Sequence, residues 1–191
     1  MDEASEANLE RESLKALAAN IVIQLFGFVG IFLFARLVDK SSLGGYYLLF
    51  ALVQLANRPN LGLCRGTRKR WSETDSPKAE LLGATLLINL VWAVTLGIVI
   101  YGFRGQIDQY IGINGSSVLF VALVSSFLLY YPFQQVISAM GYAGKQRWTE
   151  AIRSILSLPT QVILIIIGFG ALGIGYGLVA ATVISIPIAT Y

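Results

Sequence analysis

The side chain best placed to do chemistry in this sequence is an arginine inside an otherwise apolar stretch. Arg58 and Pro59 occur within "LANRPNLGLCRGTRKRW", residues 55–71. If this stretch crosses a membrane, the arginine costs roughly 2.5 to 3.5 kcal/mol on insertion scales, so its position needs a reason. Two interpretations are open: Arg58 marks the inner membrane interface, or it forms the floor of a cavity that accepts an anion. Pro59 fits both, because proline can kink a helix or end it.

Polar residues recur at helical spacing in most of the long apolar stretches. The sets are Asn20 and Gln24; Gln54, Asn57, Arg58 and Arg65; Thr85, Asn89 and Trp92; Tyr131, Gln135, Ser138 and Tyr142; and Arg153, Ser157 and Gln161. Each set falls on one face of a helix. The simplest interpretation of a single such residue is an interhelical hydrogen bond, worth under about 1 kcal/mol. Several stripes together favour a shared hydrated cavity.

The composition argues against catalytic and metal chemistry. The chain has no histidine and one cysteine, Cys64, so it offers no standard zinc site and no intrachain disulfide. Paired carboxylates, a Ser/His/Asp set and a phosphate-binding glycine loop are missing, which predicts neither an enzyme nor a cofactor. The modest net charge of +3 argues against nucleic-acid binding. No carboxylate falls within a predicted span, which counts against cation-coupled export.

The elements that must position these residues are membrane helices. The chain is 55% hydrophobic and only 13% charged, and a bilayer-spanning helix needs roughly 20 apolar residues. The charge-poor runs predict an all-α bundle of six transmembrane helices over residues 15–36, 44–64, 81–103, 118–140, 151–169 and 173–191. The last two are divided at "GFGALGIGYG", residues 168–177, because clustered glycines favour a turn. A β-barrel is disfavoured, since its strands would alternate in polarity.

The cations predict how the bundle is oriented, because Lys and Arg concentrate in cytoplasmic loops. One face holds Arg11, Lys15, Arg65, Arg68, Lys69, Arg70, Lys78, Lys145, Arg147 and Arg153, whereas the other holds Arg36, Lys40 and Arg104. We therefore expect a multi-pass protein of the cell membrane with a cytoplasmic N-terminal segment, residues 1–14. Residues 65–70 then act mainly as a topological anchor against anionic headgroups.

Four segments carry a family resemblance: "FLFARLVDKSSLGGYYLL" (32–49), "NLGLCRGTRKRWSE" (60–73), "SAMGYAGKQRWTEAIRS" (138–154) and "GALGIGYGLV" (170–179). In their order and spacing the chain resembles the N-terminal half of polysaccharide-biosynthesis flippases. These oligosaccharide-lipid transporters share a superfamily with multidrug exporters and lipid II flippases. The resemblance implies one lobe of a two-lobe transporter with a central cationic cavity. It also implies a second six-helix lobe, either beyond Tyr191 or in another subunit.

The leading hypothesis is a flippase lobe that moves lipid-linked oligosaccharide across the cytoplasmic membrane for polysaccharide or glycan biosynthesis. Arg58, flanked by Gln54 and Asn57, is the expected binding residue for the phosphate or pyrophosphate of a polyprenyl-linked sugar. Four further amides are expected to line the sugar path: Asn20, Gln24, Asn89 and Gln135. Membrane lipids are expected partners. Two alternatives stay open: a multidrug or cation antiporter of the same superfamily, and a membrane assembly subunit that transports nothing.

Overall fold

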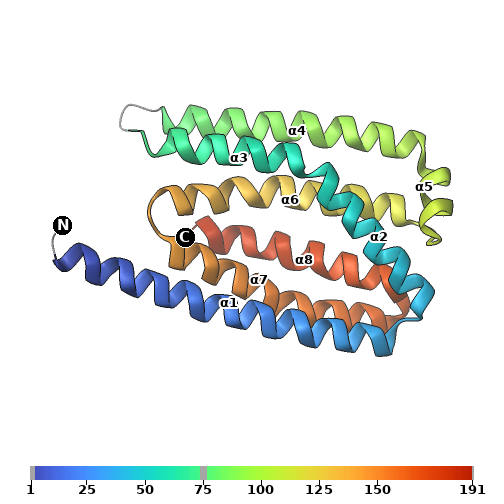
Figure 1. Cartoon of the computed structure of the whole chain (residues 1–191). Coiled ribbons are helices and arrows are strands. Elements are labelled where there is room, and N and C mark those ends of the chain that lie inside the picture. Colours follow the sequence, from blue (N-terminus) through green and yellow to red (C-terminus); the bar gives the residue numbers. More distant parts are fainter. Residues whose placement is uncertain (1–2, 74–76, 191) are drawn as a thin grey trace.

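The computed structural model describes residues 3–73 and 77–190, and every regular element in these ranges is helical. The elements are α1 (Glu3–Leu37), α2 (Lys40–Ala56), α3 (Arg58–Trp71), α4 (Lys78–Gly102), α5 (Arg104–Ile111), α6 (Ser116–Ala139), α7 (Ala143–Leu164), the π-helical turn η1 (Ile165–Phe169) and α8 (Gly170–Thr190). The start of α1, the end of α3 and the turn before α7 share one end of the bundle, and α5 lies at the other (Figure 1). The all-α prediction is confirmed for these ranges.

α1 begins well before the predicted span and packs against α7. Its first residues are rich in Ala, Glu and Leu, which are strong helix formers, so the acidic leader continues the helix. The Gly144 N–H donates to the Glu12 carboxylate at 2.9 Å, and further along Gly30 faces Leu158. Both contacts advance in the same direction, so α1 and α7 run parallel. Met1, Asp2 and Tyr191, the ends of the predicted segments, lie outside the described residues.

α7 and α8 form an antiparallel hairpin. The chain reverses at Gly168 and Gly170, whose φ angles of 108° and 53° lie where glycine is favoured. The remaining glycines of "GFGALGIGYG" have another role. Gly173 and Gly177, four residues apart on α8, face the α7 backbone, and a Cβ on Gly177 would lie 2.6 Å from the Gln161 Cα. The expected turn is therefore present but shorter than residues 168–177, and small residues let the two helices approach closely.

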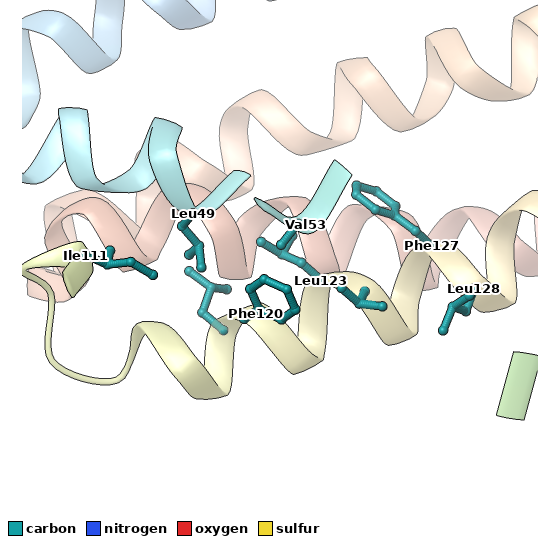
Figure 2. Close-up of a cluster of buried hydrophobic side chains, with 9 residues drawn as sticks. Leu49, Val53, Ile111, Phe120, Leu123, Phe127 and Leu128 are labelled. Carbon is teal, nitrogen blue, oxygen red and sulfur yellow. The ribbon is translucent and has the colours of Figure 1, made fainter. Parts of the chain in front are cut away.

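The largest apolar core gathers around α6. Phe120, Leu123 and Phe127 of α6 lie beside Leu49 and Val53 of α2 (Figure 2). α6 contacts α2, α3, α4, α5, α7 and α8, so it is buried on most of its surface. Its buried polar side chains include Gln134, whose amide donates to the Tyr130 hydroxyl of the same helix at 2.9 Å. α6 is the central helix against which the others pack.

The corner between α5 and α6 is held by one carboxylate. Asp108 accepts hydrogen bonds from the Ser117 N–H at 2.7 Å, the Ser116 hydroxyl at 2.8 Å and the Gly115 N–H at 3.0 Å. Partial burial of Asp108 opposes its ionised form, but these hydrogen bonds outweigh burial and hold the pKa of its carboxyl below the ordinary value. The ionised carboxylate of Asp108 therefore holds the start of α6 in place.

Acidification is expected to loosen this corner. A carboxylate with a lowered pKa stabilises the fold fully above the ordinary aspartate value of about 3.9 and loses that contribution as the pH falls through the lowered pKa. We expect Asp108→Asn to lower the melting temperature of the detergent-purified protein near neutral pH, and the difference from wild type to shrink below about pH 4. Thermal unfolding followed by circular dichroism across this range measures it. A difference that did not change with pH would contradict the prediction.

Four helical stretches in the described ranges are long and apolar enough to cross a membrane: Glu12–Leu37, Lys78–Gly102, Ser116–Ala139 and Ala143–Ile188. The last is the α7–α8 hairpin, folded back on itself. α2 and α3 have 17 and 14 residues and fall short of that length individually. The predicted helices over 81–103 and 118–140 lie close to α4 and α6. The count of six spans stays a prediction.

Candidate functional site

Arg58 begins α3 at a break in the second long apolar stretch. Where the sequence predicts one span over residues 44–64, the structure has two helices that meet at Asn57. Pro59 has no backbone N–H to continue the ladder of α2, and it occupies the first turn of α3, where that donor is not needed. Arg58 and Pro59 are exposed. Within the described ranges, Arg58 forms no ion pair.

The residues that the sequence places on one stripe divide between a buried and an exposed face. Asn57 at the junction and Asn60, Cys64 and Thr67 of α3 are buried, whereas Arg58 and Arg65 are exposed. The Asn60 amide donates to the Asn57 side-chain oxygen at 2.9 Å, and the Cys64 thiol donates to the Asn60 side-chain oxygen at 3.2 Å. The Asn57 amide nitrogen is buried without a hydrogen-bond partner in the part of the chain that the structure describes. α3 therefore presents its amides to the bundle and its arginines outward.

The predicted polar face of α4 points into the bundle. Asn89 donates to the Leu128 carbonyl of α6 at 2.9 Å, and the Trp92 indole donates to the Ala56 carbonyl of α2 at 3.1 Å. The hydroxyls of Thr85 and Thr67 lie 2.8 Å apart. These contacts are interhelical hydrogen bonds that join α4 to its neighbours.

The seven predicted site residues do not gather at one place. Asn57 and Asn89 are buried and bonded within the α3, α4 and α6 part of the bundle. Gln54, Asn20 and Gln135 are half-buried, whereas Gln24 is exposed like Arg58. Asn20 and Gln24 belong to α1, which packs against α7. The seven residues therefore remain a set of predictions, in which two members already have structural partners.

A groove of about 280 Å³ lies between α1, α2, α7 and α8. Phe34 and Tyr46 contribute apolar walls, and Ser154, Ser157 and Gln161 of α7 supply polar groups. Gln161 and Ser157 are buried, and the Ser157 hydroxyl donates to the Ser154 carbonyl at 3.0 Å. Two members of the α7 stripe predicted from spacing thus line this groove. Such a groove can hold a polar group in an apolar setting.

Arg153 is a half-buried cation that the sequence assigned both to this polar stripe and to the cytoplasmic charge count. Its side chain is 16% exposed, and its guanidinium carbon lies 5.3 Å from the centroid of the Tyr130 ring. One nitrogen lies 3.7 Å from Glu150, and Nε has no hydrogen-bond partner among the described residues. Its four-residue spacing from Ser157 is the signal that indicates an inward position.

The described residues contain no group of three or more His, Cys, Asp or Glu side chains that could hold a metal ion. The polar groups of the sites described above are side-chain amides, hydroxyls and the guanidinium groups of Arg58 and Arg153. Such groups bind and orient anions and sugars.

The helical fold and its long apolar stretches define the chain as a multi-pass helical membrane protein. No protein-family model and no solved structure matches it. It is similar to a protein of Haloferax volcanii named "Probable low-salt glycan biosynthesis flippase Agl15", with 28% identity over 183 residues. The alignment covers 94% of this chain and 38% of that protein, so the chain spans well under half of its relative's length. The resemblance to glycan flippases is thereby supported across nearly all of the sequence.

Proposed function

We propose that the chain forms a transmembrane lobe of a flippase that moves a lipid-linked oligosaccharide across the cell membrane. The observation that carries this proposal is an exposed arginine without an ion-pair partner in the described ranges, placed where α2 breaks into α3. An arginine in an apolar bundle is costly, and one that no carboxylate neutralises is suited to an anionic cargo. The similarity to a glycan flippase supports the same class of cargo.

The proposal includes the number of membrane spans and their orientation. α2 and α3 together make one crossing, and with α1, α4, α6, α7 and α8 they complete a six-span lobe. The N-terminus is cytoplasmic, since the basic end of α3 and the basic start of α7 share the end at which α1 begins (Figure 1). A second lobe closes the transport path from the opposite side.

The cargo path is assigned from side-chain placement. Arg58 binds the phosphate or pyrophosphate, and Gln54 beside it contacts the first sugar. Asn20, Gln24 and Gln135 are partly or fully exposed and are proposed along the sugar path. Asn57 and Asn89 contribute mainly by holding α3 and α4 in place, because their side chains already bond within the bundle.

Loss of the gene tests the function as a whole. In cells without it, we expect surface glycan to fall and lipid-linked oligosaccharide to accumulate on the cytoplasmic leaflet. The purified, gene-encoded protein should restore flipping of that lipid in liposomes. Proton-dependent efflux of an organic cation would instead indicate an antiporter. A stoichiometric partner protein that co-purifies, without flipping activity in liposomes, would indicate an assembly subunit.

A further inference from the structure

A second groove, of about 380 Å³, lies between α4 and α6 next to α5. Ile100, Val118 and Val121 contribute apolar walls, and Arg104 lies at the α5 end. The groove is open because residues 97 and 122 are small: a Cβ on Gly97 would lie no closer than 3.9 Å to Val121. Gly97 and Arg104 are seven residues apart, across the end of α4 and the start of α5, which corresponds to about 10 Å at the rise of a helix. This is a short apolar channel with a cation at one end.

Arg104 lies at the groove without a carboxylate partner in the described ranges. Its guanidinium carbon lies 5.1 Å from the centroid of the Tyr101 ring. Asp108, one turn further along α5, is the neighbouring carboxylate. Its oxygens accept hydrogen bonds from residues 115–117 at the start of α6. An anion at Arg104 therefore meets a cation whose acidic neighbour four residues along α5 is bonded to the start of α6.

Exposed aromatic side chains indicate how deep in the membrane the α5 end of the groove lies. Tyr101 is 70% exposed, Tyr110 72% and Phe103 55%, and all three lie in or beside α5. Tyrosine rings concentrate at the boundary between the hydrocarbon and headgroup layers. Arg104 thus lies at headgroup depth, while Gly97 and Val121 lie deeper, at the level of the acyl chains.

We propose that this groove binds an anionic membrane phospholipid, with one acyl chain between α4 and α6 and the phosphate at Arg104. A neutral or purely apolar ligand would leave the Arg104 guanidinium, at one end of the groove, without an anionic partner. A partner helix would need a contact surface longer than a channel of about two helical turns, or about 10 Å. Charge complementarity at one end and an apolar channel at the other fit a single lipid.

Native mass spectrometry of the gene-encoded protein, purified in detergent with phosphatidylglycerol or phosphatidylcholine, tests the proposal. We expect wild type to retain phosphatidylglycerol in preference to phosphatidylcholine. Arg104→Gln should reduce that preference about five-fold, which is the scale of one cation near an anionic surface. The matched control is Arg36→Gln. Arg36 is an exposed arginine in the last turn of α1, and that end of α1 lies at the α5 end of the bundle (Figure 1). Its guanidinium carbon lies 4.3 Å from the centroid of the Phe32 ring and it does not line the groove, so its loss should leave the preference unchanged.

Ala122→Phe, which fills the channel, should abolish retention of either lipid at an unchanged melting temperature. If that variant does not fold, Gly97→Leu fills the same space from the opposite wall. Equal loss in the Arg36 and Arg104 variants, or full retention by a folded channel-filling variant, would overturn the proposal. Displacement of phosphatidylglycerol by equimolar polyprenyl phosphate would overturn it as well, by assigning the groove to the carrier lipid.

Discussion

Gly177→Ala is expected to destabilise the protein by about 1 to 3 kcal/mol, the usual cost of overpacking a tight interface. A Cβ at this position would lie 2.6 Å from the Cα, Cγ and backbone nitrogen of Gln161. Backbone atoms cannot move aside as the end of a flexible side chain can, so α8 has to separate from α7. That separation also shifts Gln161, which lines the groove between α1, α2, α7 and α8. Thermal unfolding in detergent measures the loss.

The control for this experiment is Gly83→Ala. Gly83 lies in α4 with nothing within 4 Å of an added Cβ. Because alanine is the better helix former by up to about 1 kcal/mol, this variant should be neutral or slightly stabilised. If both substitutions changed the melting temperature equally, close packing of α7 on α8 would not explain the glycine at position 177.

Arg58→Ala is expected to slow glycan delivery by about ten-fold to a hundred-fold at a normal membrane level, because hydrogen bonds to a charged group contribute about 1.5 to 3 kcal/mol. Arg58 is exposed and lies seven residues, or about 10 Å, along α3 from Arg65, where the basic cluster begins. An arginine this far from the cluster is better suited to binding an anion than to marking the interface. Surface glycan in complemented cells and flipping in liposomes both measure the loss.

Two further variants separate charge from geometry and position. Arg58→Lys keeps the charge but not the planar, forked donor group, so we expect partial activity. Arg65→Ala removes an exposed cation on the same helix and should preserve delivery. Full delivery by Arg58→Ala would remove this residue from the transport path while leaving the helical fold unaffected.

Much of the helical framework could be predicted from the sequence because hydrocarbon thickness imposes a minimum length on an apolar run. The predicted helices at residues 81–103 and 118–140 differ from α4 and α6 by one to three residues at their ends. The turn within "GFGALGIGYG" was also predictable, since only glycine adopts the φ values at Gly168 and Gly170 readily. What composition could not show was that the later glycines serve packing, which depends on the neighbouring helix.

The candidate site was less predictable for a geometric reason. The stripe from Gln54 to Arg65 joins two faces of the helix, because the adjacent residues Asn57 and Arg58 point about 100° apart. The buried positions Val53, Asn57 and Asn60 keep a helical spacing across the junction, while Arg58 and Arg65 are exposed. Arg153 was predicted both as a stripe member and as a cytoplasmic cation, because the span predicted from residue 151 placed it at a membrane edge. α7 begins earlier, at Ala143, so Arg153 lies well inside a helix.

The pairing of α1 with α7 has a consequence for biosynthesis. The Gly144 to Glu12 hydrogen bond joins residues 132 positions apart, so α1 leaves the ribosome long before its main packing partner exists. Until α7 is synthesised, the surface of α1 that later packs against it must be compatible with contact with lipid. The stretch Glu12–Leu37 meets that requirement, because it is strongly apolar, with a mean hydropathy of 2.2, and most of its residues are not buried in the folded bundle. Packing of α1 into the described bundle therefore waits for α7, which is its main neighbour.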